Sequence, residues 1–93
     1  GLGDVYKRQD INPKAPVHML IIPNMHIASL AYVGPGQVPI MGHMFVVAEE
    51  IARREGVTLS GYRLVVNQGD DSGQEIPHPH MHLLGGKKLG AMG

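Results

Sequence analysis

The chain has 93 residues, which fits one small domain, and its eight basic and eight acidic residues give a formal net charge of zero. This balance lacks the basic excess typical of nucleic-acid and acidic-membrane binding, and the absence of cysteine excludes disulfides and thiolate zinc sites. No apolar run approaches the roughly 20 residues that cross a bilayer, and no signal peptide is visible, so we expect a cytoplasmic protein that binds neither membrane nor nucleic acid.

The first part of the chain is predicted to hold a leader, a turn and one strand. Residues 1–9 are polar and unpatterned and lack an initiator Met, so we interpret them as an unmatched leader or artefact outside the fold. Residues 10–16 combine two prolines with an aspartate and an asparagine, a composition typical of a turn. Residues 17–22 are mostly apolar and β-branched, which predicts a strand buried on most of both faces, with His18 inside it.

One main helix and two further strands are predicted after that strand. Apolar residues recur with the 3.6-residue period through residues 39–55, and a proline in the first turn and a glycine after the last suit a helix. Residues 63–67 and 81–84 are typical of strands, and the glycine-rich residues 68–74 of a loop. Neither an internal repeat nor a linker divides the chain.

Three of the six histidines, His78, His80 and His82, stand at alternate positions. Alternate side chains of a strand share one face and lie about 7 Å apart, so in a strand all three imidazoles would point the same way. Pro79 cannot donate to a strand ladder, which places this stretch at an edge or before regular pairing begins. Near neutral pH an imidazole can be nucleophile, acid or metal ligand. The spacing alone therefore fits a metal site, phosphate chemistry, or a polar strand face without a role.

The surroundings of the three histidines favour phosphate chemistry. The loop at residues 69–74 lies directly upstream, and its glycines let backbone N–H groups approach an anion closely. Asn67 precedes this loop and offers an amide to hydroxyl groups, although such a residue alone is more often a turn former. His18 alone would be a core histidine, but beside the triad it becomes a candidate partner of the central histidine. His26 and His43 have no such company, and we expect them on the surface and on a helix face.

The segment His-Pro-His-Met-His-Leu-Leu that begins at His78 resembles the histidine-triad (HIT) motif, His-x-His-x-His followed by apolar positions. Other segments are similar, in the same order, to the HINT branch of that family and to its bacterial HinT-like members: residues 10–18, 21–23, 26–27, 61–67, 73–75 and 83–86. The resemblance extends from Asp10 to about Met92. Because the whole ordered set has the correct spacing, it is more specific than the triad alone.

This resemblance implies an α+β fold with one main helix and an antiparallel sheet, of about five strands in the full family and fewer here, paired as a homodimer. It implies a hydrolase that cleaves purine nucleoside phosphoramidates or aminoacyl-adenylates (AMP or GMP conjugates) and releases the nucleoside monophosphate without cofactor or metal. The family's central histidine forms a covalent nucleotidyl intermediate, and its counterpart here is His80. Further catalytic positions are matched by His18, His78 and His82. Nucleotide-binding positions are matched by Asp10, Ile11, Asn67, Gly73, Gln74, Glu75, His80 and His82.

Physical reasoning supports these roles. Nucleophilic attack splits a difficult displacement into two easier steps. His80 must be neutral at its attacking nitrogen, so its other nitrogen should donate to a fixed acceptor such as a backbone carbonyl. His82 and the backbone N–H groups of residues 73–75 could hold the phosphate oxygens and the developing charge.

The sequence departs from the family ahead of Asp10, where relatives carry a helix, two strands and much of the purine pocket. We therefore expect an N-terminally truncated HIT domain over residues 10–93, with weak base discrimination. Glu75 stands where many relatives have serine, and the tail ends shortly after Leu89. Three alternatives stay open: a dinucleoside polyphosphate hydrolase of another HIT branch, a nucleotide-binding or interaction module without turnover, and, last, a zinc-binding triad.

Overall fold

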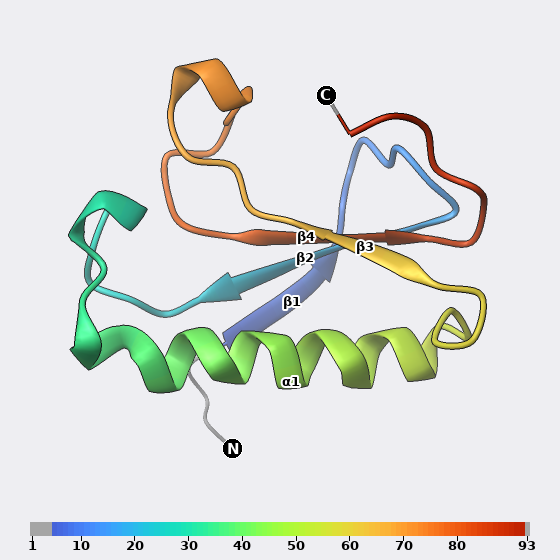
Figure 1. The fold of residues 1–93 in the computed structure, drawn as a ribbon, viewed down its shortest axis with the longest axis horizontal. Coiled ribbons are helices and arrows are strands. Elements are labelled where there is room, and N and C mark those ends of the chain that lie inside the picture. The colour runs from blue at the N-terminus through green and yellow to red at the C-terminus, as the bar shows by residue number, and fades with distance from the viewer. Residues whose placement is uncertain (1–4, 93) are drawn as a thin grey trace.

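The computed structural model describes residues 5–92, which form one long helix and a four-stranded antiparallel sheet. In chain order the strands and the helix are β1 (Val5–Gln9), β2 (Val17–Pro23), α1 (Val38–Arg54), β3 (Tyr62–Val65) and β4 (Met81–Gly85). Three short 3-10 helices lie in the connections: η1 (Leu30–Tyr32), η2 (Pro35–Gln37) and η3 (Asp70–Ser72). The strand order is β1-β2-β4-β3, and α1 crosses one face of the sheet (Figure 1). The predicted α+β fold with one main helix is confirmed.

Helix α1 covers the sheet with a continuous apolar stripe. Its buried residues recur at helical spacing and are Met44, Val47, Ala48, Ile51 and Ala52. Pro39 occupies the first turn, where its missing N–H costs nothing, and Arg53 and Arg54 lie in the last turn, where they favour the negative end of the helix dipole. Gly56 follows the helix with a φ of +74°, which glycine adopts without strain. Within residues 5–92, no helix has the length and apolarity that a bilayer span requires.

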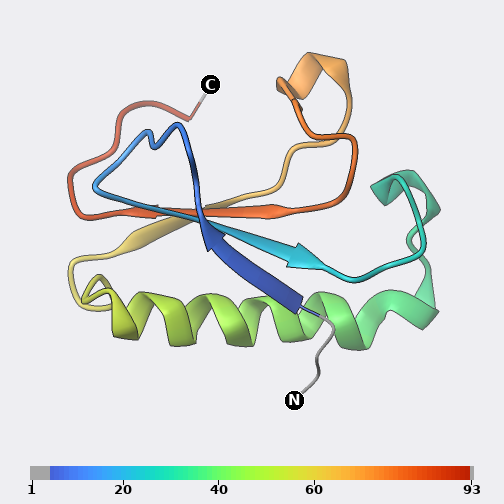
Figure 2. The same cartoon turned by 180° about the vertical axis from the view of Figure 1, so that it is seen from behind.

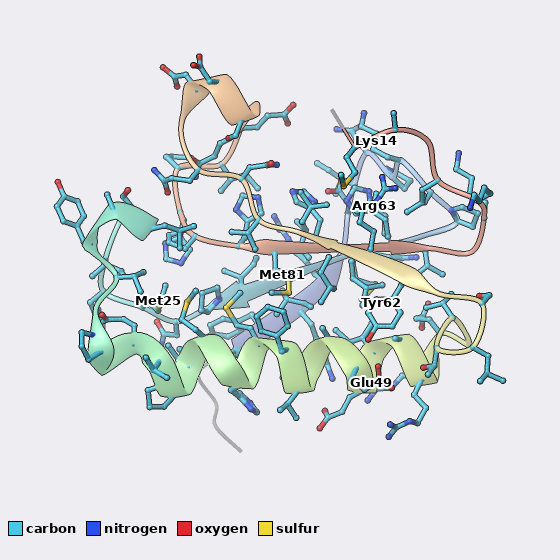
Figure 3. The ribbon with its side chains drawn as sticks, viewed as in Figure 1. Lys14, Met25, Glu49, Tyr62, Arg63 and Met81 are labelled. Atoms are coloured by element: carbon cyan, nitrogen blue, oxygen red, sulfur yellow. The ribbon has the colours of Figure 1, made fainter. Side chains whose placement is uncertain are left out.

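The strand register divides the side chains between two faces of the sheet. β2 pairs with β4 so that Ile21 lies opposite Met81 and Leu20 opposite His82. Met81 points toward α1, whereas Lys14 lies beyond the other face (Figure 3). The core joins the helix-facing side chains of the sheet to the helix, and its members are Ile21, Met44, Val47, Ala48, Ile51, Ala52, Val57, Met81 and Leu83. His82 therefore belongs to the face that α1 does not cover.

A hydrogen bond ties β3 to the helix beneath it. The Tyr62 hydroxyl donates to Glu49 Oε2 at 2.5 Å, and the two side chains lie together between β3 and α1 (Figure 3). This bond raises the pKa of Tyr62 above its ordinary value, with smaller contributions from burial and from the negative charge of Glu49. The bond therefore favours the protonated phenol, which helps to hold the outer strand of the sheet against the helix.

Residues 5–9 form a strand of the sheet rather than an unattached leader. Figure 2 shows β1 beside β2, with which it pairs antiparallel from Val5 opposite Pro23 onward. In this edge strand only Val5 is partly buried, so the sequence has no alternating apolar pattern that would predict the strand. Backbone pairing along the free edge of β2 accounts for the strand. The exclusion of residues 1–9 from the fold is therefore wrong for residues 5–9, and residues 1–4 lie outside the described part of the chain.

Candidate functional site

The histidine triad lies across the start of β4. Only His82 belongs to the strand, because β4 begins at Met81 and the prolines on both sides of His78 supply no backbone donors. His78 lies before the strand, and its Nε2 donates to the carbonyl oxygen of Pro23 at 3.0 Å. The three imidazoles therefore do not lie on one strand, and the expectation that this stretch begins before regular pairing is confirmed. His80 and His82 are nevertheless neighbours, since their ring centroids lie 4.9 Å apart with an interplanar angle of 69°.

His80 has one nitrogen engaged and one free. The residue is buried, and its Nδ1 lies 2.8 Å from the carbonyl oxygen of His78. A carbonyl can only accept, so Nδ1 carries the proton and Nε2 of the neutral ring keeps its lone pair. Within residues 5–92 no side-chain nitrogen or oxygen is both buried and unpartnered, so the free Nε2 of His80 retains contact with solvent. These are the features expected of a histidine nucleophile.

A chain of hydrogen bonds sets the proton position on His82. The backbone N–H of Lys14 donates to His18 Nδ1 at 2.9 Å, so the neutral His18 ring carries its proton on Nε2. This Nε2 lies 2.8 Å from His82 Nδ1 and 3.4 Å from Asp10 Oδ2, and it donates to His82. His82 then holds its own proton on Nε2. Two adjacent rings thus present opposite functions: a lone pair on His80 and an N–H on His82.

The surroundings of His82 keep the ring neutral. Burial lowers its pKa below the ordinary value of 6.5, and the nearby His80 and His18 rings lower it further. The carboxylates of Asp10 and Glu75 act in the opposite direction but do not outweigh these effects. A neutral imidazole with Nδ1 accepting a hydrogen bond is therefore the stable form of this residue.

Asp10, His18 and His82 also bring potential metal ligands together, with one donor atom from each within 4.8 Å of the others. His18 could bind a metal here only through Nε2, which would move its proton to Nδ1. That proton would then face the N–H of Lys14, and two donors would oppose each other across 2.9 Å. The hydrogen bonds around His18 therefore disfavour a metal at this cluster.

The glycine-rich loop contributes backbone amides rather than side chains. Gln74 Oε1 accepts from the backbone N–H of Gly69 at 2.7 Å, and Gln74 Nε2 donates to the carbonyl of Ile76 at 2.9 Å. The Gln74 side chain thus stabilises the loop instead of facing a ligand. Gly73 also donates its N–H within the loop. Within residues 5–92 the amides of Gln74 and Glu75 have no such partner, so both are available to an anion.

Of the other predicted residues, Asp10 contacts a histidine of the site. Asp10 links the turn to the site, because its Oδ1 accepts from the Asn12 N–H at 2.7 Å while Oδ2 faces His18. Ile11 beside it is 87% exposed, so its side chain is open to a ligand. Asn67 follows β3 and is half-buried, whereas Glu75 is exposed. The structure therefore brings Asp10 and three of the histidines into one cluster.

Comparison with known proteins decides the family. The model of the HIT domain matches residues 2–89, a range that includes most of the expected leader. The chain belongs to the HIT domain family. This HIT domain is 48% identical over 84 residues to the purine nucleoside phosphoramidase of Escherichia coli strain K12. The matched region covers 90% of this chain and 71% of that relative. The resemblance drawn from the histidine motif is confirmed.

Solved structures show the same fold. A HIT family hydrolase from Legionella pneumophila has a TM-score of 0.91 and 39% sequence identity, over 95% of this chain and 79% of that one. A histidine triad protein from Clostridium difficile has a TM-score of 0.90 and 38% identity, over 98% of this chain and 79% of that one. The arrangement of β-sheet and helix is thus that of HIT proteins.

One feature of this HIT domain that sequence reasoning missed is an apolar cavity of about 220 Å³ beside the nucleophile candidate. It is lined by Leu30, Met41, Met44, Phe45, Val66, Pro79, His80 and Met81. These residues come from four separate segments of the chain, so no local sequence pattern predicts the cavity. A larger hollow of about 660 Å³ lies between the end of α1 and residues 86–89, and none of the predicted site residues lines it. The smaller cavity, by contrast, has His80 in its wall.

Proposed function

We propose that this HIT domain hydrolyses purine nucleoside phosphoramidates or aminoacyl-adenylates and releases the nucleoside monophosphate. The observation that carries the proposal is the pair of complementary nitrogens, a lone pair on His80 beside an N–H on His82. The similarity to an Escherichia coli purine nucleoside phosphoramidase supports the class of substrate. Nucleophile and donor are the two functions that displacement at a phosphorus centre requires.

The reaction has two displacements. His80 Nε2 forms a bond to the α-phosphorus while the bond from phosphorus to the leaving amine breaks, and the amine departs with a proton. The nucleotidyl-His80 ring is then positively charged, and its Nδ1–H remains bonded to the His78 carbonyl. Water attacks the phosphorus, the phosphorus–Nε2 bond breaks, and the electron pair returns to His80. Water also releases a proton in this step, which balances the proton taken by the amine.

The remaining residues hold the nucleotide. The His82 Nε2–H and the amides of Gln74 and Glu75 would donate to the phosphoryl oxygens, where preorganised donors act most strongly. Asp10 can accept hydrogen bonds from ribose hydroxyls through a carboxylate already held by the turn. Asn67 follows Val66, which lines the cavity with His80, and would offer its side-chain amide to the nucleotide. The Glu75 carboxylate stays in water, because the side chain is exposed, and so its charge is largely screened from the phosphate.

The covalent intermediate provides the test. Incubation with an adenosine phosphoramidate, acid quench and peptide mass spectrometry should locate one added nucleotide on His80. His80→Ala should lose activity by on the order of 10³-fold or more, while His26→Ala, which alters an exposed histidine, should retain it. A nucleotide on another residue, or full turnover by His80→Ala, would contradict the assignment.

The same assay separates the alternatives. Faster cleavage of a dinucleoside polyphosphate than of the phosphoramidate would favour the neighbouring HIT branch. Tight binding of AMP without hydrolysis of either substrate would favour a module without turnover.

We also propose that the protein lies in the cytoplasm, and fractionation of the source cells would test this location.

We further propose that the domain forms a homodimer through β3 and α1. β3 is an edge strand of the sheet, and an edge leaves backbone donors and acceptors available for pairing. Phe45 of α1 and Val66 after β3 line one cavity and are 57% and 39% exposed, and Val38 and Val46 of α1 are 63% and 54% exposed. Light scattering after gel filtration should give twice the chain mass, and Phe45→Glu should give the monomer. Leu59→Glu, at a fully exposed position, is the control, and a monomeric parent chain would contradict the proposal.

A further inference from the structure

We propose that the backbone N–H of Lys14 is a positioning group that keeps His82 a neutral hydrogen-bond donor, so that His82 does not supply the leaving group's proton. The inference rests on the proposed phosphoryl transfer but concerns a group outside the triad. Lys14 acts through its main chain, whose N–H can only donate and cannot titrate in water. It therefore imposes one tautomer on His18, and His18 imposes one on His82.

The turn that carries this amide is held on several sides. The Asp10 N–H donates to the His18 carbonyl at 2.9 Å, and the Asp10 carboxylate accepts from the Asn12 N–H at 2.7 Å. Ala15 is buried directly after Lys14. A Cβ at Gly86 would lie 3.0 Å from the Pro16 Cβ, which shows how closely the turn packs against the chain after β4. The amide is thus fixed relative to the strand that carries His82.

Any other protonation pattern places two donors against each other. A proton added to His82 Nδ1 would face the Nε2–H of His18 across 2.8 Å. Moving the His18 proton to Nδ1 would relieve that contact, but the proton would then face the N–H of Lys14 across 2.9 Å. A general acid must carry a spare proton, and this chain of hydrogen bonds leaves no position for one.

The charged groups around His82 do not change this conclusion. His80 and His18 disfavour a positive charge on the ring, while the carboxylates of Asp10 and Glu75 favour one. Asp10 Oδ2, however, lies 3.4 Å from His18 Nε2, where it stabilises the proton on that nitrogen. It therefore favours the tautomer of His18 that carries its proton on Nε2, the nitrogen that faces His82. The proton for the amine must then come from solvent, and His82 acts only through its Nε2–H.

Tautomers can be measured without any substrate. Nitrogen-15 NMR of the histidine side chains in the full chain should show His18 protonated on Nε2 alone and His82 protonated on Nε2 alone near neutral pH. His18 protonated on Nδ1 would overturn the proposal. Because this readout is independent of turnover, it distinguishes failure of the positioning role from failure of the proposed function.

Lys14→Pro removes the N–H, and Lys14→Ala keeps it as a matched control. Lys14→Ala should retain the tautomers and the pH–rate profile. Lys14→Pro should give mixed tautomers, a fall in kcat of about 10–100-fold and a new dependence of rate on His82 protonation. If Lys14→Pro fails to fold, replacement of the amide before residue 14 by an ester removes the same donor. Unchanged tautomers in the folded Lys14→Pro chain or in the ester would overturn the proposal.

Substitution of His82 tests the consequence for catalysis. His82→Gln places an amide N–H near the position of the imidazole Nε2–H but cannot act as an acid. It should lose about tenfold in kcat, whereas His82→Ala should lose about 10²–10³-fold, the usual effect of deleting one donor to a developing oxyanion. Equal losses in the two variants would show that proton transfer, not hydrogen bonding, is the role of His82.

Discussion

Removal of the His78 side chain should separate structure from chemistry within the triad. His78 Nε2 donates to the Pro23 carbonyl at 3.0 Å, and the His78 carbonyl accepts from His80 Nδ1 at 2.8 Å. His78→Ala deletes the first bond and keeps the second, because the carbonyl belongs to the backbone. The variant should therefore lose stability while His80 keeps its tautomer and most of its reactivity.

The expected magnitude follows from that single bond. A neutral hydrogen bond contributes a net of about 0.5–1.5 kcal/mol, so we expect the free energy of unfolding of His78→Ala to fall by about 1 kcal/mol. For a domain of this size 1 kcal/mol corresponds to a fall in Tm of about 4–8 °C. The rate of phosphoramidate hydrolysis, measured well below Tm, should fall by less than about tenfold, against on the order of 10³-fold or more for His80→Ala.

Thermal melts followed by circular dichroism, with initial rates on the same preparations, would measure both effects. His78→Gln keeps an N–H donor and should recover part of the lost Tm. A folded His78→Ala protein as inactive as His80→Ala would refute the reasoning, because it would give the His78 imidazole a chemical role. An unchanged Tm would show that the bond to Pro23 contributes nothing to stability.

Three further predictions concern metal, pH and the core. A chelator should leave activity and Tm unchanged, since the hydrogen bonds of His18 disfavour a metal at its cluster. Stoichiometric zinc whose removal unfolds the chain would contradict this. The fold lowers the pKa of His82 below 6.5, so the free energy of unfolding should be highest above pH 6.5 and should fall as the pH drops through the pKa of the folded state. Thermal melts between pH 7 and this pKa should show a smaller fall in Tm for His82→Gln. Leu83→Ala empties a fully buried position and should cost about 2–5 kcal/mol in denaturant unfolding, while Leu59→Ala at a fully exposed position should cost almost nothing.

Much of the architecture could be predicted from local sequence pattern. The 3.6-residue period of apolar residues predicted the helix at 38–54, and apolar runs predicted the strands at 17–23 and 81–85. The predicted ends agree with the observed ones to within about two residues. These patterns predict the elements because the side chains that an element buries recur along the sequence with the period of that helix or strand. β1 escaped prediction because an edge strand held by backbone pairing needs no such repeat.

The histidine motif, together with the ordered segments that resemble the same family, likewise predicted the family and the candidate residues. It could not determine the state of each ring, because a tautomer depends on whichever group lies beside each nitrogen. His18 and His82 are 64 positions apart, and the pairing of β2 with β4 brings them to 2.8 Å. The Lys14 amide and the Pro23 carbonyl are main-chain groups that every sequence contains, so nothing in the residue types marks them. Only the tertiary structure, by placing those groups, decides that His80 offers a lone pair and His82 a proton.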